Sequence, residues 1–199
     1  AGWSSVLKLL EDYVLTTMIV ALLSPLLIAT AIAIKLDSPG PVLFRQRRLG
    51  FNNRVFWIYK FRSMYHRDVP ERRTRQATRD DPRITRVGRF IRRTSIDELP
   101  QLFNVLEGSM SLVGPRPHAI DHNEDYGRRI RGYFARHKVK PGITGWAQVN
   151  GLRGETDALD KMKARVEHDI HYAENWSLLF DLRILAMTAL VVLFQRSAY

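Results

Sequence analysis

The sequence predicts an α+β domain that is predominantly helical, contains a small β element and associates with a membrane. A run of 22 residues without charge, at positions 13–34, is long enough to cross a bilayer core as a helix. Several later segments have the pattern of helices, whereas residues 53–61 have the aromatic and β-branched content of a strand. A chain of 199 residues fits one domain with an appended membrane segment.

The composition excludes several classes of protein. Hydrophobic residues make up 45% of the chain, which is enough for a core, while 26% charged residues argue against a fully embedded protein. There is no cysteine, so disulfides and thiolate metal sites are excluded. Because the chain begins with Ala1 and Gly2 rather than methionine, we expect further sequence upstream.

Positive charge is concentrated in one block. Residues 45–93 contain 16 Lys and Arg against 4 Asp and Glu, a balance of +12, in a chain whose formal net charge is +11. Such a block favours a polyanionic partner: nucleic acid, anionic lipid headgroups or phosphorylated substrates. Considered alone, it is more often a solvated basic face.

The apolar segment is interrupted near its centre by Ser24 and Pro25. Proline removes a backbone hydrogen bond and clashes with the preceding turn, although a serine side chain can satisfy the freed carbonyl. The residues alone leave two arrangements open, a kinked helix that crosses the membrane and a hairpin whose two ends return to one face. Arg45, Arg47 and Arg48 follow the segment and place this side in the cytoplasm.

Turn signals divide the middle of the chain. Residues 38–41, SPGP, change the chain direction, and the polar stretch at 66–83 is expected to be a loop or a short exposed helix. Residues 84–93 predict an amphipathic helix with Ile84, Val87, Phe90 and Ile91 on one face.

The second half of the chain alternates loops and helices. Residues 108–118, GSMSLVGPRPH, predict a turn, a brief extended run and a rigid loop, and residues 140–154 predict an ordered loop. Helices are expected at residues 126–137, 156–172 and 176–194. The last one contains Asp181 and Arg183, so we expect it to lie at an interface or in the core rather than to cross the membrane.

The adjacent carboxylates Asp97 and Glu98 interrupt the basic residues in the stretch RRTSIDELPQLFNV. A structural interpretation is helix capping, with Ser95 as N-cap and Glu98 completing a capping box, or with Asp97 itself as N-cap before Pro100. A functional interpretation is that an ionised Asp attacks phosphorus, while cations neutralise the phosphate and the neighbouring carboxylate holds Mg²⁺ or positions a reactant.

Basic residues elsewhere fit phosphate recognition, although each motif is weak alone. The two prolines of GPRP hold Arg116 in a stiff loop, which lowers the entropy lost when its guanidinium binds phosphate. Lys60 and Arg62 lie two residues apart on a candidate strand. His118 and His122 lack a third ligand at recognisable spacing, and no P-loop, GxSxG or GxGxxG element occurs, so zinc, NTPase, hydrolase and dinucleotide sites lack support.

Taken together and in order, four motifs are specific. The stretches SPGPVLFRQRRLG, YKFRSM, RRTSIDELPQLFNVLEGSMSLVGPRP and KPGITGWAQVNG resemble the bacterial monotopic phosphoglycosyl transferases, within the bacterial sugar transferase family. The ending ENWSLLFDLRIL is similar to the undecaprenyl-phosphate glucose phosphotransferase branch. The resemblance implies a re-entrant membrane helix at residues 1–36, broken at Ser24 and Pro25. It also implies a catalytic domain with interfacial helices at 37–199, on the cytoplasmic face of the bacterial inner membrane.

The resemblance further implies a transfer in two steps. Asp97 attacks the β-phosphorus of a UDP-sugar, UMP leaves, and undecaprenyl phosphate then takes the sugar phosphate as the first membrane step of exopolysaccharide, capsule or O-antigen synthesis. Glucose is the expected sugar and galactose the alternative. Mg²⁺ is the expected cofactor, held by Asp97 and Glu98. The residues expected to bind substrate phosphates are Lys60, Arg62, Arg92, Arg116, Gln148 and Arg153.

One position departs from the family pattern. Smaller members of the family place an arginine directly after VNG, whereas here Leu152 follows and Arg153 comes one residue later. The resemblance implies anionic membrane lipids as partners, no nucleic acid, and allows for a homodimer. The competing hypotheses are a non-enzymatic, membrane-tethered nucleic-acid binder and a polytopic scaffold whose residues 13–34 cross the membrane fully.

Overall fold

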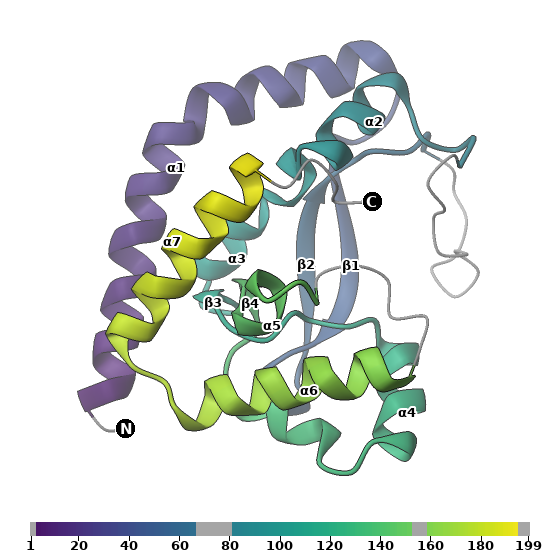
Figure 1. Ribbon diagram of the computed structural model, residues 1–199. Coiled ribbons are helices and arrows are strands. Elements are labelled where there is room, and N and C mark those ends of the chain that lie inside the picture. The colour runs from purple at the N-terminus through teal and green to yellow at the C-terminus, as the bar shows by residue number, and fades with distance from the viewer. Residues whose placement is uncertain (1–2, 67–80, 153–158, 195–199) are drawn as a thin grey trace.

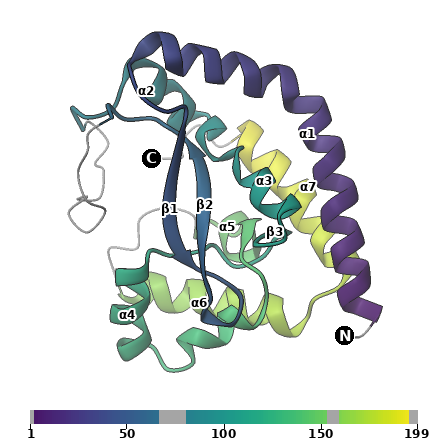
Figure 2. The same ribbon diagram turned by 180° about the vertical axis from the view of Figure 1, so that it is seen from behind.

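The computed structural model describes residues 3–66, 81–152 and 159–194. A two-stranded hairpin stands at the centre of a mostly helical domain, and one long helix runs along its side and across its top (Figure 1). Seen from behind, helices α4 (Ile120–Arg129) and α6 (Leu159–Glu174) gather at one end of the hairpin (Figure 2). The predicted class, α+β with mostly helices and a small β element, is confirmed.

The apolar N-terminal segment forms one continuous helix, α1 (Trp3–Asp37), which bends near its middle (Figure 1). Pro25 lies inside this helix, and its missing N–H leaves the carbonyl of Ala21 without its helical donor. The Ser24 hydroxyl donates to that carbonyl at 2.8 Å, so the bend leaves no unsatisfied backbone oxygen there. In the part of the chain that the structure describes, α1 alone is long and apolar enough to cross a membrane.

Both arms of α1 pack one face against the same folded domain. Before the bend, Thr16 is fully buried and Ile19 packs on the central core. After the bend, Leu27 and Ile34 are buried against β2 (Val55–Phe61) and α2 (Arg86–Arg93). The opposite face of the helix is apolar and exposed, and its large side chains are Val14, Met18, Leu22, Ile28, Ile32 and Leu36.

Strands β1 (Leu43–Leu49) and β2 (Val55–Phe61) form the antiparallel hairpin. β2 confirms the strand expected at residues 53–61, whereas sequence reasoning missed β1, because its three arginines hide the alternation. The edge of β2 is closed by Asn104 of α3 (Gln101–Leu106). Its side chain accepts from the Tyr59 N–H at 2.9 Å and donates to the Trp57 carbonyl at 2.7 Å, as a neighbouring strand would.

A second, parallel pair joins β3 (Ser111–Val113) to β4 (Gly142–Thr144), and a short helix, α5 (Trp146–Val149), follows. The expectation that residues 140–154 form only a loop was therefore wrong, and residues 153–154 lie outside the described part. The glycines that suggested a loop serve close packing instead. A Cβ at Gly142 would lie 2.1 Å from the backbone nitrogen of Gly114, so the two segments pair only because that side chain is absent.

Helix α2 (Arg86–Arg93) confirms the helix expected at residues 84–93. The Thr85 hydroxyl caps it by accepting from the Gly88 N–H at 2.9 Å. Ile91 is buried as predicted, but Phe90 is 55% exposed, so its placement on the inner face was wrong. The buried side of α2 consists of Gly88 and Ile91, and Gly88 packs directly against the carbonyl of Ser63.

Of the three helices expected in the second half of the chain, two are observed and one is divided. The helix expected at 126–137 is two elements, α4 and the 3₁₀ segment η4 (Tyr133–Lys138), because the backbone becomes extended at Ile130 and left-handed at Gly132, which has φ 76°. α6 and α7 (Leu178–Phe194) agree with the helices expected at 156–172 and 176–194 within a few residues, although residues 156–158 are not described. Ile184 on α7 is fully buried and Leu179 is exposed, so this helix packs on one side only.

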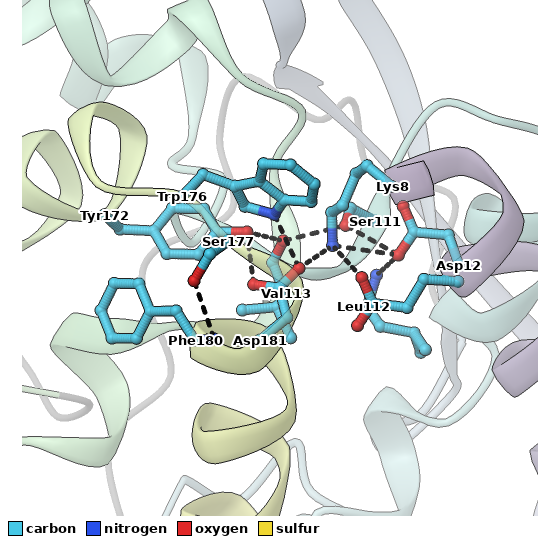
Figure 3. Close-up of polar contacts among 11 residues, drawn as sticks. Lys8, Asp12, Ser111, Leu112, Val113, Tyr172, Trp176, Ser177, Phe180 and Asp181 are labelled. Atoms are coloured by element: carbon cyan, nitrogen blue, oxygen red, sulfur yellow. Dashed lines mark hydrogen bonds and ion pairs between the residues drawn. The ribbon is translucent and has the colours of Figure 1, made fainter. Parts of the chain in front are cut away.

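A buried polar cluster fastens the first arm of α1 to the domain (Figure 3). Asp181 on α7 has no exposed surface; it lies 2.6 Å from the Lys8 ammonium and accepts from the Tyr172 hydroxyl at 2.8 Å and the Trp176 Nε1–H at 2.9 Å. Asp12 on α1 accepts two further hydrogen bonds from the β3 segment, at 2.9 and 3.0 Å. Helices α1, α6 and α7 and strand β3 thus all contribute to this buried polar cluster.

Replacing Asp181 by alanine is expected to destabilise the fold strongly. The change leaves the Lys8 charge and the Trp176 N–H without their acceptor in a buried place, which costs about 3–5 kcal/mol. Unfolding in one detergent should show a melting temperature lower by roughly 10 °C. Asp160→Ala is the matched control, because Asp160 pairs with Lys163 at an exposed position. Equal melting temperatures for the two variants would contradict the prediction.

Candidate active site

Asp97 and Glu98 lie in a single 3₁₀ turn, η3 (Ile96–Glu98), between α2 and α3. Ser95 enters this turn in the left-handed region, at φ 59°, and its side chain makes no capping bond. α3 begins after Pro100, again without a side-chain cap. The predicted helix capping was therefore wrong, because a left-handed residue before the pair and a proline after it separate both carboxylates from a regular helix start.

Glu98 is held by two cations from different parts of the chain. Lys60 at the end of β2 donates to its Oε1 at 2.8 Å. Arg116 donates through Nη2 to Oε1 at 2.5 Å and through Nη1 to Oε2 at 3.1 Å, which is a bidentate pair. Burial by itself would raise the pKa of Glu98, but Arg116 and Lys60 lie so close that its pKa falls well below the ordinary value. Glu98 is therefore a fixed negative charge.

Asp97 has the opposite environment. Its side chain is buried, and the hydrogen bonds of the described residues include none to its carboxylate. Burial and the neighbouring Glu98 charge raise the pKa of Asp97 above its ordinary value. Lys60, Arg92 and Arg116 oppose that rise, and Arg92 lies in the last turn of α2. The two adjacent carboxyls thus differ: one is fixed by ion pairs and the other remains available for chemistry.

A fully buried arginine, Arg136, holds the loop that carries Arg116. Arg136 of η4 donates to the backbone carbonyl of Arg116 at 2.7 Å and pairs with Asp169 of α6 at 2.7 Å. The exposed fractions of the Arg136 and Asp169 side chains are 1% and 2%. Sequence reasoning missed this pair, because residues 33 positions apart in two charged segments carry no local signal.

Two neutral histidines belong to the same support. Arg136 Nη1 donates to His118 Nδ1 at 2.6 Å, and burial followed by the Arg136 charge lowers the pKa of His118 well below the ordinary value. His137 donates from Nδ1 to Asn53 Oδ1 at 2.5 Å, and burial lowers its pKa to about 4. His118, which sequence reasoning did not support as a zinc ligand, is hydrogen-bonded within the fold.

A small polar pocket opens beside the carboxylate pair. Its lining residues come from the hairpin, the start of α3 and the GPRP loop, and they are Arg48, Ile58, Lys60, Gln101, Arg116 and Pro117. Lys60 and Arg116 were predicted to bind phosphate. Arg48 and Gln101 were not, although both stand within the motifs that carry the family resemblance.

Other predicted residues lie elsewhere. Arg62 is buried, and its guanidinium donates to the carbonyls of Ile34, Ser38 and Pro39, so it caps the end of α1 and none of these bonds reaches the carboxylate pair. Gln148 on α5 donates to the Ile143 carbonyl at 3.1 Å and does not line the pocket. Arg153 lies outside the described residues. Substrate contact by these three stays a prediction.

The donor set is compatible with Mg²⁺ only together with a phosphate ligand. In the described ranges, no group of three or more His, Asp or Glu side chains could hold a metal ion. Mg²⁺, however, is commonly bound through one or two carboxylates together with substrate phosphates. Asp97 and Glu98 supply carboxylates of that kind, although both Glu98 oxygens already accept from cations.

Comparison with known proteins places these residues in a wider group. A family model described as bacterial sugar transferase matches residues 3–195. The chain is 54% identical over 199 residues to a UDP-glucose:undecaprenyl-phosphate glucose-1-phosphate transferase of Escherichia coli K12, covering 100% of this chain and 43% of that protein. It is 55% identical over 194 residues to the Xanthomonas campestris protein of the same name, covering 98% and 40%.

A relative with a different sugar in its name is nearly as similar. A UDP-N-acetylgalactosamine-undecaprenyl-phosphate N-acetylgalactosaminephosphotransferase of Aeromonas hydrophila is 47% identical over 183 residues, covering 92% of this chain and 42% of that protein. The chain therefore spans about 40–43% of the length of these three curated relatives.

The two buried histidines predict loss of stability in mild acid. Because their folded-state pKa values are depressed, the unfolded chain binds protons below about pH 6.5 while the folded chain does not, until about pH 4 for His137. Stability is thus complete above pH 6.5 and falls as the pH drops from 6.5 towards 4. Between pH 7.5 and 5.5, each histidine should remove about 1 kcal/mol.

The measurement is the melting temperature across this pH range. His137→Gln retains a donor for Asn53 but does not titrate, so its melting temperature should fall less steeply with acid than that of the wild type. His171→Gln, at an exposed position on α6, is the matched control. The prediction fails if both variants follow the wild-type curve.

Proposed function

The chain belongs to the bacterial sugar transferase family, and on that premise we propose that the whole protein transfers glucose-1-phosphate from UDP-glucose to undecaprenyl phosphate and releases UMP. The observation that carries the proposal is that the environments of Asp97 and Glu98 shift the pKa values of these two neighbouring carboxyls in opposite directions. A buried carboxylate without a hydrogen bond from the described residues, surrounded by three cations, is suited to attack a phosphorus atom. A carboxylate fixed by two of those cations is suited to position them.

The proposed first step is attack of an Asp97 carboxylate oxygen on the β-phosphorus of the donor. A P–O bond to aspartate forms, the P–O bond to UMP breaks, and UMP takes the electron pair. In the second step, a phosphate oxygen of undecaprenyl phosphate attacks the same phosphorus and displaces Asp97, which regains its negative charge. The products are UMP and a polyprenyl diphosphate sugar, so atoms and charges balance.

The cations make this attack physically possible. A carboxylate and a diphosphate repel each other unless positive charge lies between them. Lys60, Arg92 and Arg116 all lower the pKa of Asp97, so their positive charges favour its ionised form. Glu98 keeps Lys60 and Arg116 in position before substrate arrives, so little reorganisation is needed. When Mg²⁺ is bound, Asp97 and Glu98 would hold it, and it would neutralise charge on the diphosphate.

We also propose that α1 enters and leaves the membrane on the cytoplasmic side of the bacterial inner membrane. Lys8 and Asp12 before the bend pack on α7 and β3, while Ile34 after the bend packs on α2, and all of these belong to one water-exposed domain. A helix that crossed the bilayer would carry its two ends to opposite sides, where they could not both contact that domain. The exposed apolar face of α1 and the outward leucines of α7 supply the membrane contact, with anionic lipids beside the basic block.

The sugar rests on the relatives alone. Two of the three relatives compared carry UDP-glucose in their names, and the third carries UDP-N-acetylgalactosamine. Glucose is therefore proposed first, and galactose remains the alternative of the same mechanism. A nucleic-acid binder, suggested by the basic block, is less well supported because Arg48, Lys60 and Arg62 of that block face the site or the interior.

The experiment is a half-reaction without lipid acceptor. Purified wild-type protein with UDP-glucose should release up to one UMP per chain and gain the mass of a hexose phosphate at Asp97. Asp97→Asn should lose both signals, and Glu98→Gln should slow UMP release at least about 100-fold, since it loosens two cations. Asp125→Asn, at an exposed position on α4, is the matched control and should behave as wild type. UMP release by Asp97→Asn at the wild-type rate would refute the proposed nucleophile.

The membrane arrangement is tested by cysteine labelling, which is clean because the chain has no native cysteine. Ser5→Cys lies at the start of α1 and Asn52→Cys lies in the hairpin turn, both at exposed positions. A membrane-impermeant thiol reagent should label both in inverted vesicles and neither in intact spheroplasts. Labelling of Ser5→Cys in spheroplasts, with Asn52→Cys protected, would show a helix that crosses the membrane.

A further inference from the structure

The pocket beside the carboxylate pair contains two hydrogen-bond donors that the fold itself does not use. Arg48 lies on the inward face of β1, and the register of the hairpin places it on the same face as Ile58 and Lys60. Its Nη2 donates to Gln46 at 2.6 Å, but its buried Nε has no hydrogen-bond partner. A buried N–H donor without an acceptor is costly unless a ligand supplies the acceptor.

Gln101 offers the second donor. Its side chain is 1% exposed at the start of α3, and its buried Nε2 also has no partner. A buried primary amide donor without an acceptor costs about 1–3 kcal/mol, so the position is disfavoured unless the amide has a use. Gln101 and Arg48 line the same pocket, so both residues with an unused donor belong to one space.

The charges around this space specify the ligand. Four cations, namely Arg48, Lys60, Arg92 and Arg116, surround two carboxylates, so the site retains an excess of two positive charges. A group with several acceptor oxygens and two negative charges would balance that excess and accept from both unused donors. A phosphate dianion or a diphosphate has this chemistry, whereas a neutral sugar hydroxyl does not.

We propose that Arg48 and Gln101 form a phosphate subsite adjoining the Asp97/Glu98 pair, with Arg48 Nε and Gln101 Nε2 donating to phosphate oxygens of a substrate. The assignment to a substrate rests on the proposed function, in which two phosphate ligands come to this site. One is the diphosphate of the nucleotide-sugar donor and the other is the phosphate of the polyprenyl acceptor. The shared phosphate chemistry defines the subsite, and kinetics separate the two sources.

The first experiment measures binding without turnover. The full chain carrying Asp97→Asn is titrated with inorganic pyrophosphate by calorimetry, alone and combined with Gln101→Leu, Gln101→Glu or Arg48→Lys. We expect the Kd to rise about 10-fold with Gln101→Leu and Arg48→Lys, and about 100-fold with Gln101→Glu, which replaces a donor by a negative charge. Arg47→Lys is the matched control, because Arg47 neighbours Arg48 on the opposite, exposed face of the hairpin. Pyrophosphate affinity that is equal in all of these proteins would overturn the subsite.

The second experiment assigns the source in otherwise wild-type protein. A KM for UDP-glucose raised about 10-fold by Gln101→Leu, with the KM for undecaprenyl phosphate unchanged, identifies the donor diphosphate. The reverse pattern identifies the acceptor phosphate. Unchanged values for both substrates would overturn the substrate assignment. If wild-type protein releases no UMP, the proposed function fails, while the pyrophosphate titration still decides the subsite. Melting temperatures close to wild type, measured alongside, show that the variants are folded.

Discussion

The carboxylate of Glu98 is the interaction on which the arrangement of the site depends. It accepts from Lys60 at the end of the hairpin and from Arg116 in the GPRP loop, and it stands in the turn between α2 and α3. These segments are far apart in sequence, and their cations would repel one another without a shared anion. A single side chain therefore joins the second strand, the η3 turn and the proline-rich loop.

The same interaction explains how two neighbouring carboxyls acquire different chemistry. Each ion pair that Glu98 makes lowers the pKa of Glu98. The resulting negative charge on Glu98, together with burial, raises the pKa of Asp97. The cations are thus partly neutralised before a substrate enters, but the excess of positive charge remains. The loop that carries Arg116 is also held by buried Arg136, which donates to the carbonyl of Arg116 and pairs with Asp169 of α6. Arg116 is held at both its backbone and its guanidinium.

Local patterns predicted several of the elements but missed β1, β4 and α5, and neither these patterns nor the resemblance predicted the long-range contacts. Period and composition found β2, α2, α6 and α7, and Lys60, Glu98 and Arg116 do meet. Helix capping at Ser95 failed because the local SxxE pattern cannot reveal a left-handed residue. Arg62 was expected near phosphate because it shares a motif with Lys60, yet it caps α1. The Arg136 and Asp169 ion pair depends on tertiary packing alone, which no spacing rule detects.

The placement of Arg62 connects the membrane helix to the chemistry. Arg62 lies two residues after Lys60, and its guanidinium donates to the carbonyl of Ile34 in the last turn of α1 and to that of Ser38 just after it. The end of β2 that presents Lys60 to Glu98 is therefore also fixed to the end of α1. At the other arm, Asp181 and Asp12 fix the start of the helix to α7 and β3. With both arms fastened, the exposed apolar face of α1 keeps a set position relative to Asp97. In the proposed reaction, an acceptor whose chain lies in lipid would have to bring its phosphate to the buried carboxylate of Asp97. That reaction would require such a fixed relation, because a helix free to tilt would present the phosphate at varying depth. On this proposal, the polar contacts that fix α1 would serve the reaction as well as the stability of the fold.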